Sequence, residues 1–416
     1  MSASPSAPEI LDQLLTELPR ALSTYGTPAH RLEEAMGVCA EKLGVPADFF
    51  SMPTAVLCSI GAGEALRTHI VRVQPGQVDL EKLDRVDAVL GRLLRQQISP
   101  GEALATVRAI ERAPARYPAA LVVACFGAVA TGAAQFFGGA WVDALAALAI
   151  GLIVGLFGLF AARRRQLSRL TEFASGLVAA GLAGGLVSLL PGLTPGIVII
   201  ASLIVLIPGL TLTVAVNELA TRNLVSGTAR LMGALMILLS IGFGVGLGQA
   251  VAAPLARSAG LSTPLLAASP AVPVAPMPAW TQFAAILLVP CALAVLFRAR
   301  PRDMLVIVPA AAIGYYGARS GAAWLGPELG AWVGALAVGV FANGVARLNR
   351  RPTAITLVPG IMLLVPGAIG FRSISSFLAQ DALAGVQTAF TVAIIATAIV
   401  TGLLLANVLV RPRQSL

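Results

Sequence analysis

Two proline–glycine pairs inside apolar segments are the residues best placed to do chemistry. Pro208-Gly209 and Pro366-Gly367 stand 158 residues apart. Proline removes a backbone donor and glycine lets the chain turn freely, so each pair should break a helix. The freed N-termini of such half-helices bind anionic substrate groups in transporters. We therefore predict that a substrate or ion pathway passes both pairs, with a simple helix kink as the alternative.

Hydroxyl and guanidinium groups follow the two pairs. Thr211 and Thr213 come after the first pair. We expect them to hydrogen-bond a substrate, with bonding back to their own helix as the alternative. Arg372 comes after the second pair, and a cation within a membrane is costly and usually functional, because it can receive a carboxylate. The alternative for Arg372 is that its side chain extends to the outer membrane surface.

Six carboxylates occur after residue 116, and they divide by their position in the predicted helices. Four open predicted helices, where a carboxylate favours the N-terminus: Asp143, Glu172, Asp303 and Glu328. Capping is the preferred interpretation for these four, with Asp143 and Glu172 kept as second-choice pathway residues. Glu218 and Asp381 fit capping less well. We predict that they are the proton-linked groups, with a plain interfacial location as the alternative.

The composition divides the chain into two regions. The sequence is 57% hydrophobic and 12% charged, whereas a soluble domain is typically about 25% charged. Fourteen of the 20 acidic residues lie before residue 117, so a head of soluble composition precedes about 300 residues of membrane type. The net charge of +9 comes from arginines in short loops. Because the head itself is slightly acidic, a nucleic-acid-binding protein is excluded.

The head shows little that resembles an active site. His30 lies near Glu33 and Glu34, but the second histidine of a zinc-protease helix is missing, so we predict a surface position for His30. The four cysteines lack metal-ligand or redox spacing. We predict no cofactor and no metal, and without a Walker motif a pump must use an ion gradient. An enzyme or sensor anchored by the membrane region is a third reading, which no nucleophile–base pair supports.

We expect the head, residues 1–116, to be a small α+β unit. Amphipathic helices are predicted over 11–23, 28–44 and 80–94 and from 100 onward, and strand-type segments over 49–60 and 66–73. Thr27 is predicted to cap the second helix. Ser99 and Glu102 are predicted to form a capping box that opens the fourth.

Ten membrane spans are predicted after the head, because a helix of about 20 apolar residues crosses the hydrocarbon core. They begin near residues 119, 142, 172, 196, 230, 280, 303, 329, 353 and 384. If the head is cytoplasmic, fourteen arginines fall in inner loops and three in outer loops. This asymmetry is a strong positive-inside signal.

The two halves of the membrane region resemble each other. Segment 207–209 matches 365–367, and with the same offset 223–227 matches 381–385, which places Asn223 opposite Asp381 and in the predicted pathway. Five spans per repeat is an odd number, so the halves must be inverted, as in many secondary transporters. We predict an all-α membrane domain of two inverted five-helix repeats, joined by an extracytoplasmic Pro/Ala-rich linker, with these bounds: 117–252, 253–279 (linker) and 280–416.

Several short motifs follow one another in a specific order. They are Gly26 with Arg31 and Glu33, segment 116–118, segment 138–145, Pro208-Gly209 followed by Asn217-Glu218 and then Ser226-Gly227 with Arg230, and segment 359–367. Together they are similar to the bacterial threonine/serine exporter family over nearly the whole chain. The resemblance adds Asn217 and Arg230 to the predicted pathway and marks Gly26, Arg31 and Glu33 in the cytoplasmic head.

The resemblance also implies an activity. It implies a non-enzymatic, proton-coupled antiporter that exports threonine and serine, in a bacterial inner membrane with both termini cytoplasmic. The implied partners are the small substrate, protons and the lipid bilayer, with no nucleic acid and with homo-oligomerisation left open. The alternative is an exporter of another small metabolite, such as the dicarboxylate succinate.

Overall fold

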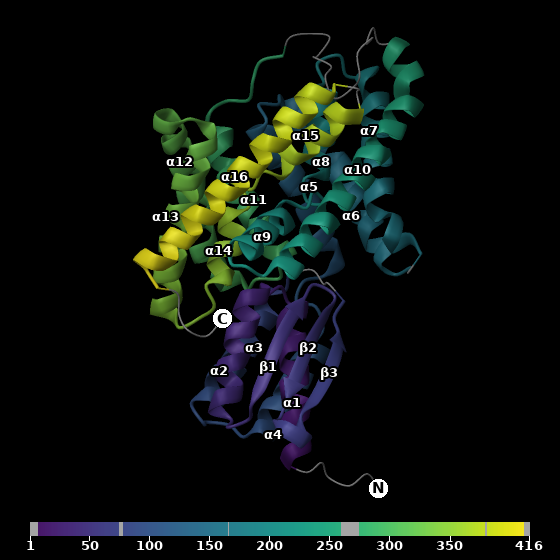
Figure 1. Cartoon of the computed structure of the whole chain (residues 1–416). Coiled ribbons are helices and arrows are strands. Elements are labelled where there is room, and N and C mark those ends of the chain that lie inside the picture. Colours follow the sequence, from purple (N-terminus) through teal and green to yellow (C-terminus); the bar gives the residue numbers. More distant parts are fainter. Residues whose placement is uncertain (1–6, 75–77, 165, 259–273, 379–380, 412–416) are drawn as a thin grey trace.

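The computed structural model describes residues 7–74, 78–164, 166–258, 274–378 and 381–411. The chain forms a head and, next to it, a larger bundle of helices (Figure 1). The head contains α1 (Ala7–Thr24), α2 (Ala29–Lys42), β1 (Ala47–Met52), β2 (Ala55–Ile60), β3 (Arg67–Arg72), α3 (Leu80–Leu94) and α4 (Pro100–Arg112). The predicted α+β head is therefore confirmed in its element types and order.

The sheet of the head is antiparallel, in the order β1-β2-β3. The prediction of one strand over 49–60 was wrong, because the chain turns back after Met52 and pairs that residue with Ala55. Thr27 does not cap α2, whose N-cap is Pro28 without a side-chain bond. The capping box of Ser99 and Glu102 is present at the start of α4.

In the described part of the helical domain there are eight long helices and two pairs of short ones. The long helices are α5 (Ala119–Phe136), α6 (Trp141–Ala162), α7 (Thr171–Val187), α10 (Leu224–Ser258), α11 (Trp280–Leu296), α12 (Met304–Leu325), α13 (Pro327–Asn349) and α16 (Ala382–Leu409). The short pairs are α8 (Pro195–Leu203) with α9 (Gly209–Ala220), and α14 (Ala354–Ile361) with α15 (Gly367–Leu378). Each short pair occupies one of the two predicted spans that contain a Pro-Gly pair, near residues 196 and 353.

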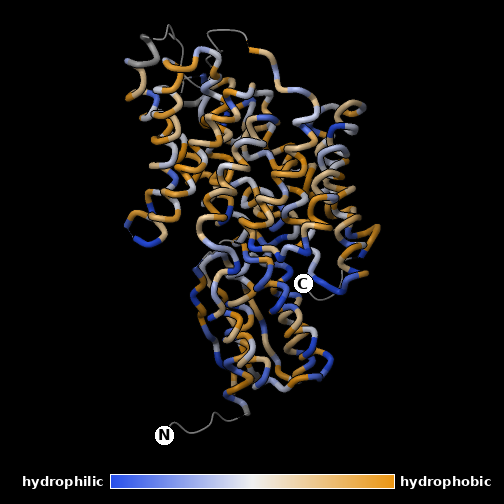
Figure 2. Tube along the Cα trace, turned by 180° about the vertical axis from the view of Figure 1, so that it is seen from behind, coloured by the Kyte–Doolittle hydropathy of each residue, from blue (hydrophilic) through white to orange (hydrophobic). Residues whose placement is uncertain are grey.

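Within the described residues, six helices are long and apolar enough to cross a membrane. Apolar residues dominate the helices of the bundle, and hydrophilic residues gather where the bundle meets the head (Figure 2). The chain is thus a multi-pass membrane protein, and the count of ten spans stays a prediction. Of the predicted linker at 253–279, residues 259–273 lie outside the described part of the chain.

Glycines let pairs of long helices approach closely. A β-carbon on Gly244 of α10 would lie 2.0 Å from the carbonyl oxygen of Phe173 on α7. On α16, a β-carbon on Gly402 would lie 2.7 Å from the carbonyl oxygen of Trp332 on α13. Small residues at such contacts are the usual means of packing helices in a membrane.

The head is packed onto the bundle rather than tethered to it. Its core cluster, which includes Leu32 and Leu90, continues into Ala294, Ala299 and Ile307 of the helical domain. The backbone N–H of Leu80, at the start of α3, donates to the carbonyl of Phe297 at 3.0 Å. The two parts therefore share one hydrophobic core at their boundary.

Candidate functional site

The two Pro-Gly pairs interrupt their helices and meet each other. Gly209 is the first residue of α9 and Gly367 is the first residue of α15. A β-carbon on Gly209 would lie 2.5 Å from Cγ1 of Val365 and 3.3 Å from Cα of Gly367. A β-carbon on Gly367 would in turn lie 3.2 Å from Cα of Gly209. The predicted breaks are confirmed, and we name their contact, formed by 207–209 and 365–367, the crossing.

The crossing brings two helix N-termini together. The first N–H groups of a helix have no intrahelical acceptor, and the macrodipole places partial positive charge there. Pro208 is the N-cap of α9 and has no side-chain donor or acceptor for these groups. An anionic group at the crossing would therefore meet favourable dipoles from α9 and from α15.

The two threonines after the first break differ in their surroundings. The Thr213 hydroxyl is buried and donates to the carbonyl oxygen of Gly209 at 3.2 Å. This is the back-bonding arrangement that was the alternative for this residue. Thr211 is half-buried on the first turn of α9, so it is the better placed of the two to contact a substrate.

Glu218 lies fully buried near the end of α9, where the bundle meets the head. Arg230 Nε donates to its two oxygens at 3.1 and 2.9 Å, and the Ser226 hydroxyl donates to Oε2 at 2.8 Å. The backbone N–H of Ala29, the first residue of α2, donates to Oε1 at 2.9 Å. Glu218 thus has the partners of an ionised carboxylate, and one of them belongs to the head.

A second contact of the same kind lies beside Glu218. Asn223 Nδ2 donates to Glu33 Oε2 at 3.1 Å, and the backbone N–H of Ser51 donates to Glu33 Oε1 at 2.7 Å. The structure therefore brings four of the predicted residues to one boundary: Glu33 from the head, and Glu218, Asn223 and Arg230 from the helical domain. Asn217 is half-buried next to Glu218.

The start of α2 places further head residues at this boundary. His30 is half-buried rather than on the surface, so that prediction was wrong, and its Nδ1 atom is buried without a hydrogen-bond partner. Burial, and then the charge of Arg31, lowers the pKa of His30 to about 4. Burial also lowers the pKa of Arg31 from its ordinary value. Gly26 has a φ of +99°, which glycine adopts without strain as α1 ends.

Asp381 and Arg372 are not part of this group. Asp381 is exposed and is the N-cap of α16, accepting from the N–H of Ala384 at 3.0 Å. Arg372 is exposed, and its guanidinium lies 5.9 Å from the ring centroid of Phe137 at the end of α5. The capping geometry preferred for other acids thus also describes Asp381, and the role of Arg372 stays a prediction.

The acids at helix starts lie where capping was expected. Asp143 is buried and accepts from the N–H groups of Ala140 at 2.8 Å and Thr194 at 2.6 Å. It therefore joins the start of α6 to the loop before α8. Glu172 and Glu328 lie in the first turns of α7 and α13, and Asp303 precedes α12.

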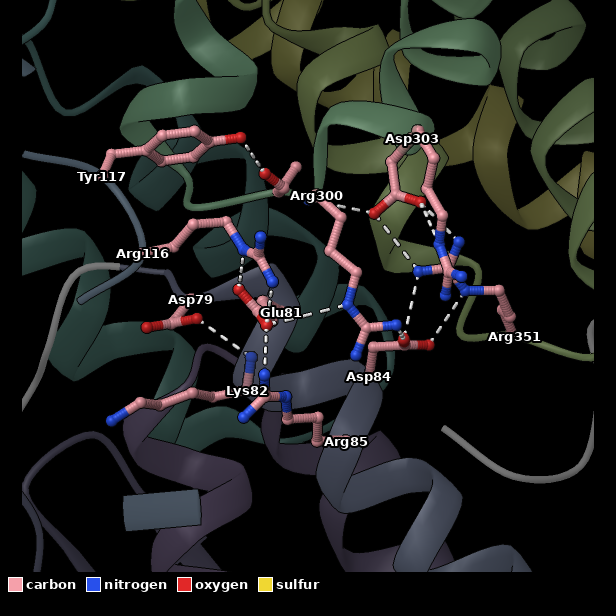
Figure 3. Close-up of polar contacts among 12 residues, drawn as sticks. Asp79, Glu81, Lys82, Asp84, Arg85, Arg116, Tyr117, Arg300, Asp303 and Arg351 are labelled. Atoms are coloured by element: carbon pink, nitrogen blue, oxygen red, sulfur yellow. Dashed lines mark hydrogen bonds and ion pairs between the residues drawn. The ribbon is translucent and has the colours of Figure 1, made fainter. Parts of the chain in front are cut away.

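An ionic network between α3 and the helical domain was not predicted from the sequence. We name it the α3 network (Figure 3). Its carboxylates are Asp79, Glu81, Asp84 and Asp303, and its arginines are Arg116, Arg298, Arg300 and Arg351. The available signals were the acidic start of α3 and the arginines in the loops that were predicted to be inner. Neither signal predicts which arginine pairs with which carboxylate.

Two arginines carry most of the α3 network. Arg300 Nη1 lies 2.7 Å from Asp84 Oδ2, and Arg351 Nη2 lies 3.0 Å from the same oxygen. Arg351 also pairs with Asp303, so it joins the head to the start of α12. On the other side of Asp84, the hydrogen bond from Arg116 lowers the pKa of Glu81.

Comparisons with known proteins agree with this two-part membrane architecture. A family model described as "Putative threonine/serine exporter" matches residues 13–252, and one described as "Threonine/Serine exporter, ThrE" matches residues 282–409. The first match covers the head and the helices up to α10, and the second begins in α11. No solved structure gives a significant match to the chain.

Three similar curated proteins are fungal and are named pheromone-regulated membrane protein 10. The one from Eremothecium gossypii is 27% identical over 372 residues, which cover 87% of this chain and 48% of that protein. Those from Pichia sorbitophila and Candida albicans are both 29% identical, covering 89% and 85% of this chain but 37% and 32% of the relatives. This chain thus spans less than half the length of each of these relatives.

Proposed function

We propose, from the premise that this chain belongs to the threonine/serine exporter family, that it is a secondary transporter that exports threonine and serine under the proton motive force. The head, residues 1–116, would be cytoplasmic, and the membrane would be a bacterial inner membrane with both termini inside. The observation that carries the proposal is the crossing, where two broken helices meet at mirrored Pro-Gly pairs.

Helix contacts support the proposed inverted repeats, 117–252 and 280–416. With α5 to α10 set against α11 to α16, each contact has a counterpart. α7 packs on α10 as α13 packs on α16, and α6 packs on α8 as α12 packs on α14. The broken helices also exchange partners, since α9 contacts α16 and α15 contacts α10. This correspondence is what an inverted-repeat transporter would show around a central site.

The crossing suits the carboxylate that all amino acids share. Half-helix N-termini favour an anion, and here two of them converge. The half-buried Thr211, two residues past Gly209, would supply hydrogen-bonding capacity for an ammonium or hydroxyl group. We propose that the substrate carboxylate binds at the N-termini of α9 and α15 when the crossing opens.

Glu218 is the proposed proton-linked group, with Asp381 as the second. A proton on Glu218 would remove the charge that Arg230 and the N–H of Ala29 now stabilise. Proton binding would thus weaken a contact between the transport helices and the head. That link between protonation and movement is what coupling to a proton gradient needs.

The test is efflux of preloaded labelled threonine from proteoliposomes, with and without an uncoupler, for wild type and Glu218→Gln. We expect uncoupler-sensitive efflux in the wild type and its loss in the variant. Succinate efflux without threonine efflux would move the function to the dicarboxylate alternative. Threonine efflux at the same rate with and without the uncoupler would refute the proton coupling.

The crossing has its own variant. Gly367→Ala should reduce threonine efflux at least tenfold, because its β-carbon would meet Ile207 Cγ2 at 2.9 Å and the backbone of Gly209. Gly181→Ala is the matched control, since nothing lies within 4 Å of its β-carbon position. Equal efflux from both variants would remove the crossing from the mechanism.

A further inference from the structure

The head contacts both halves of the helical domain at one end of the bundle. On the first half, the start of α2 binds Glu218 at the end of α9, and Glu33 binds Asn223 just before α10. Glu218 is held in turn by Arg230 of α10. We name this set of contacts the α2 contact.

On the second half, the α3 network holds the segments that lead into α12 and α14. Asp84 pairs with Arg300, just before α12, and with Arg351, just before α14. Arg298 adds a pair with Asp79 at 3.1 Å. The head is therefore bonded to the end of one broken helix pair and to the entrance of the other.

From this arrangement we propose that the head is a clamp on the two halves of the transporter, and that opening of the bundle toward the head requires the α2 contact to release while the α3 network stays bound. The reason is mechanical. Alternating access needs the two repeats to move against each other, and a rigid body bonded to both prevents that movement at its own end. The contacts of the head with both halves do not depend on transport. The opening that they control rests on the proposed transport function.

The two sides of the clamp differ in strength, and this decides which side releases. Across the boundary, the α3 network joins three arginines, Arg298, Arg300 and Arg351, to Asp79 and Asp84, with Arg300 and Arg351 sharing Asp84. The α2 contact has one buried carboxylate, Glu218, and Thr27 Oγ1 and His30 Nδ1 beside it are buried and have no hydrogen-bond partner among the residues that the structure describes. Buried polar atoms without partners cost stability. On the α3 side, Thr353 Oγ1, just before α14, is likewise buried without a hydrogen-bond partner among the described residues.

The experiment measures hydrogen–deuterium exchange of the full-length protein in nanodiscs. Ala29→Pro deletes the N–H that binds Glu218, at a first helical position where proline is tolerated. It should raise exchange in residues 215–226 at least fivefold while leaving 297–304 and 350–356 unchanged. Asp84→Asn should raise exchange in 297–304 and 350–356. Glu17→Gln, which removes a paired carboxylate inside the head, should change none of these segments.

Other outcomes would overturn the clamp. The clamp is refuted if residues 215–226 exchange in the Ala29→Pro variant at the same rate as in the wild type. It is also refuted if the Glu17→Gln variant shows an equal rise in exchange in these residues. If Ala29→Pro does not fold, Asn223→Ala, which removes the bond to Glu33, gives the same reading. With transport established, Ala29→Pro should raise the initial rate of threonine efflux at least threefold. Absence of any wild-type flux would instead refute the proposed function, while the exchange data would still decide the clamp.

Discussion

At the scale of single residues, the surroundings of an acidic side chain distinguish its contacts better than its residue type does. Glu218 and Asp381 were both predicted to be proton-linked groups, yet Glu218 is buried among four hydrogen bonds and Asp381 is an exposed helix cap. Asp143, the second choice, is as buried as Glu218, but it binds only backbone N–H groups. Of these three acids, Glu218 alone pairs with a cation and contacts the head within the described residues.

His30 gives a pH-dependent prediction at this scale. Its pKa is lowered to about 4 by burial, so between pH 6.5 and 4 the unfolded chain binds more protons than the folded one. The stabilising contribution is therefore present above pH 6.5 and is lost as the pH falls toward 4. We expect the wild type to lose about 1–2 kcal/mol more than His30→Gln between pH 7 and 4.5.

Chemical unfolding of both proteins in detergent at the two pH values measures this difference. Parallel losses in the wild type and His30→Gln would show that the head tolerates a charged His30, contrary to its buried position at the start of α2.

At the scale of elements, proline and glycine decided where helices end and how close they come. The breaks at Gly209 and Gly367 followed from backbone chemistry, because proline cannot donate to the helix ladder. The close approach of α7 and α10 depends on glycine for another reason: there is no space for a β-carbon at Gly244.

Gly244 and Gly246 form a matched pair of substitutions on α10. Gly244→Ala should lower stability by about 1–3 kcal/mol, because its β-carbon would lie 2.0 Å from the Phe173 carbonyl oxygen. Gly246→Ala has nothing within 4 Å and should be neutral or stabilising by up to about 1 kcal/mol. Thermal unfolding of the purified variants distinguishes the two. A neutral Gly244→Ala would mean that α7 and α10 are packed less closely than described.

At the scale of the whole molecule, charge joins the head to the bundle. Arg351 contacts Asp84 from the head and Asp303 from the bundle, and its side chain is 22% exposed. Arg302 lies near the same Asp303 at 3.9 Å but is 64% exposed. Removing one partner from a buried ionic network leaves charges without compensation, whereas removing an exposed partner changes little.

Arg351→Gln should therefore destabilise the docked protein by about 2–4 kcal/mol, and Arg302→Gln by less than about 0.5 kcal/mol. The measurement is limited proteolysis of the head in full-length protein, read as the rate of cleavage in the two variants. Similar rates for both would contradict a head that is held by the α3 network.

The sequence by itself determined the division into head and membrane region, the family and the positions of the helix breaks. Composition, helix caps and Pro-Gly pairs are local signals, and each acts on the backbone within a few residues. Only the tertiary structure decided the partners. Glu218 meets Ala29 across 189 residues, and Arg351 meets Asp84 across 267. Such pairings depend on how whole helices pack, because any of several arginines in the loops between helices carries the same charge and has the same local sequence signal.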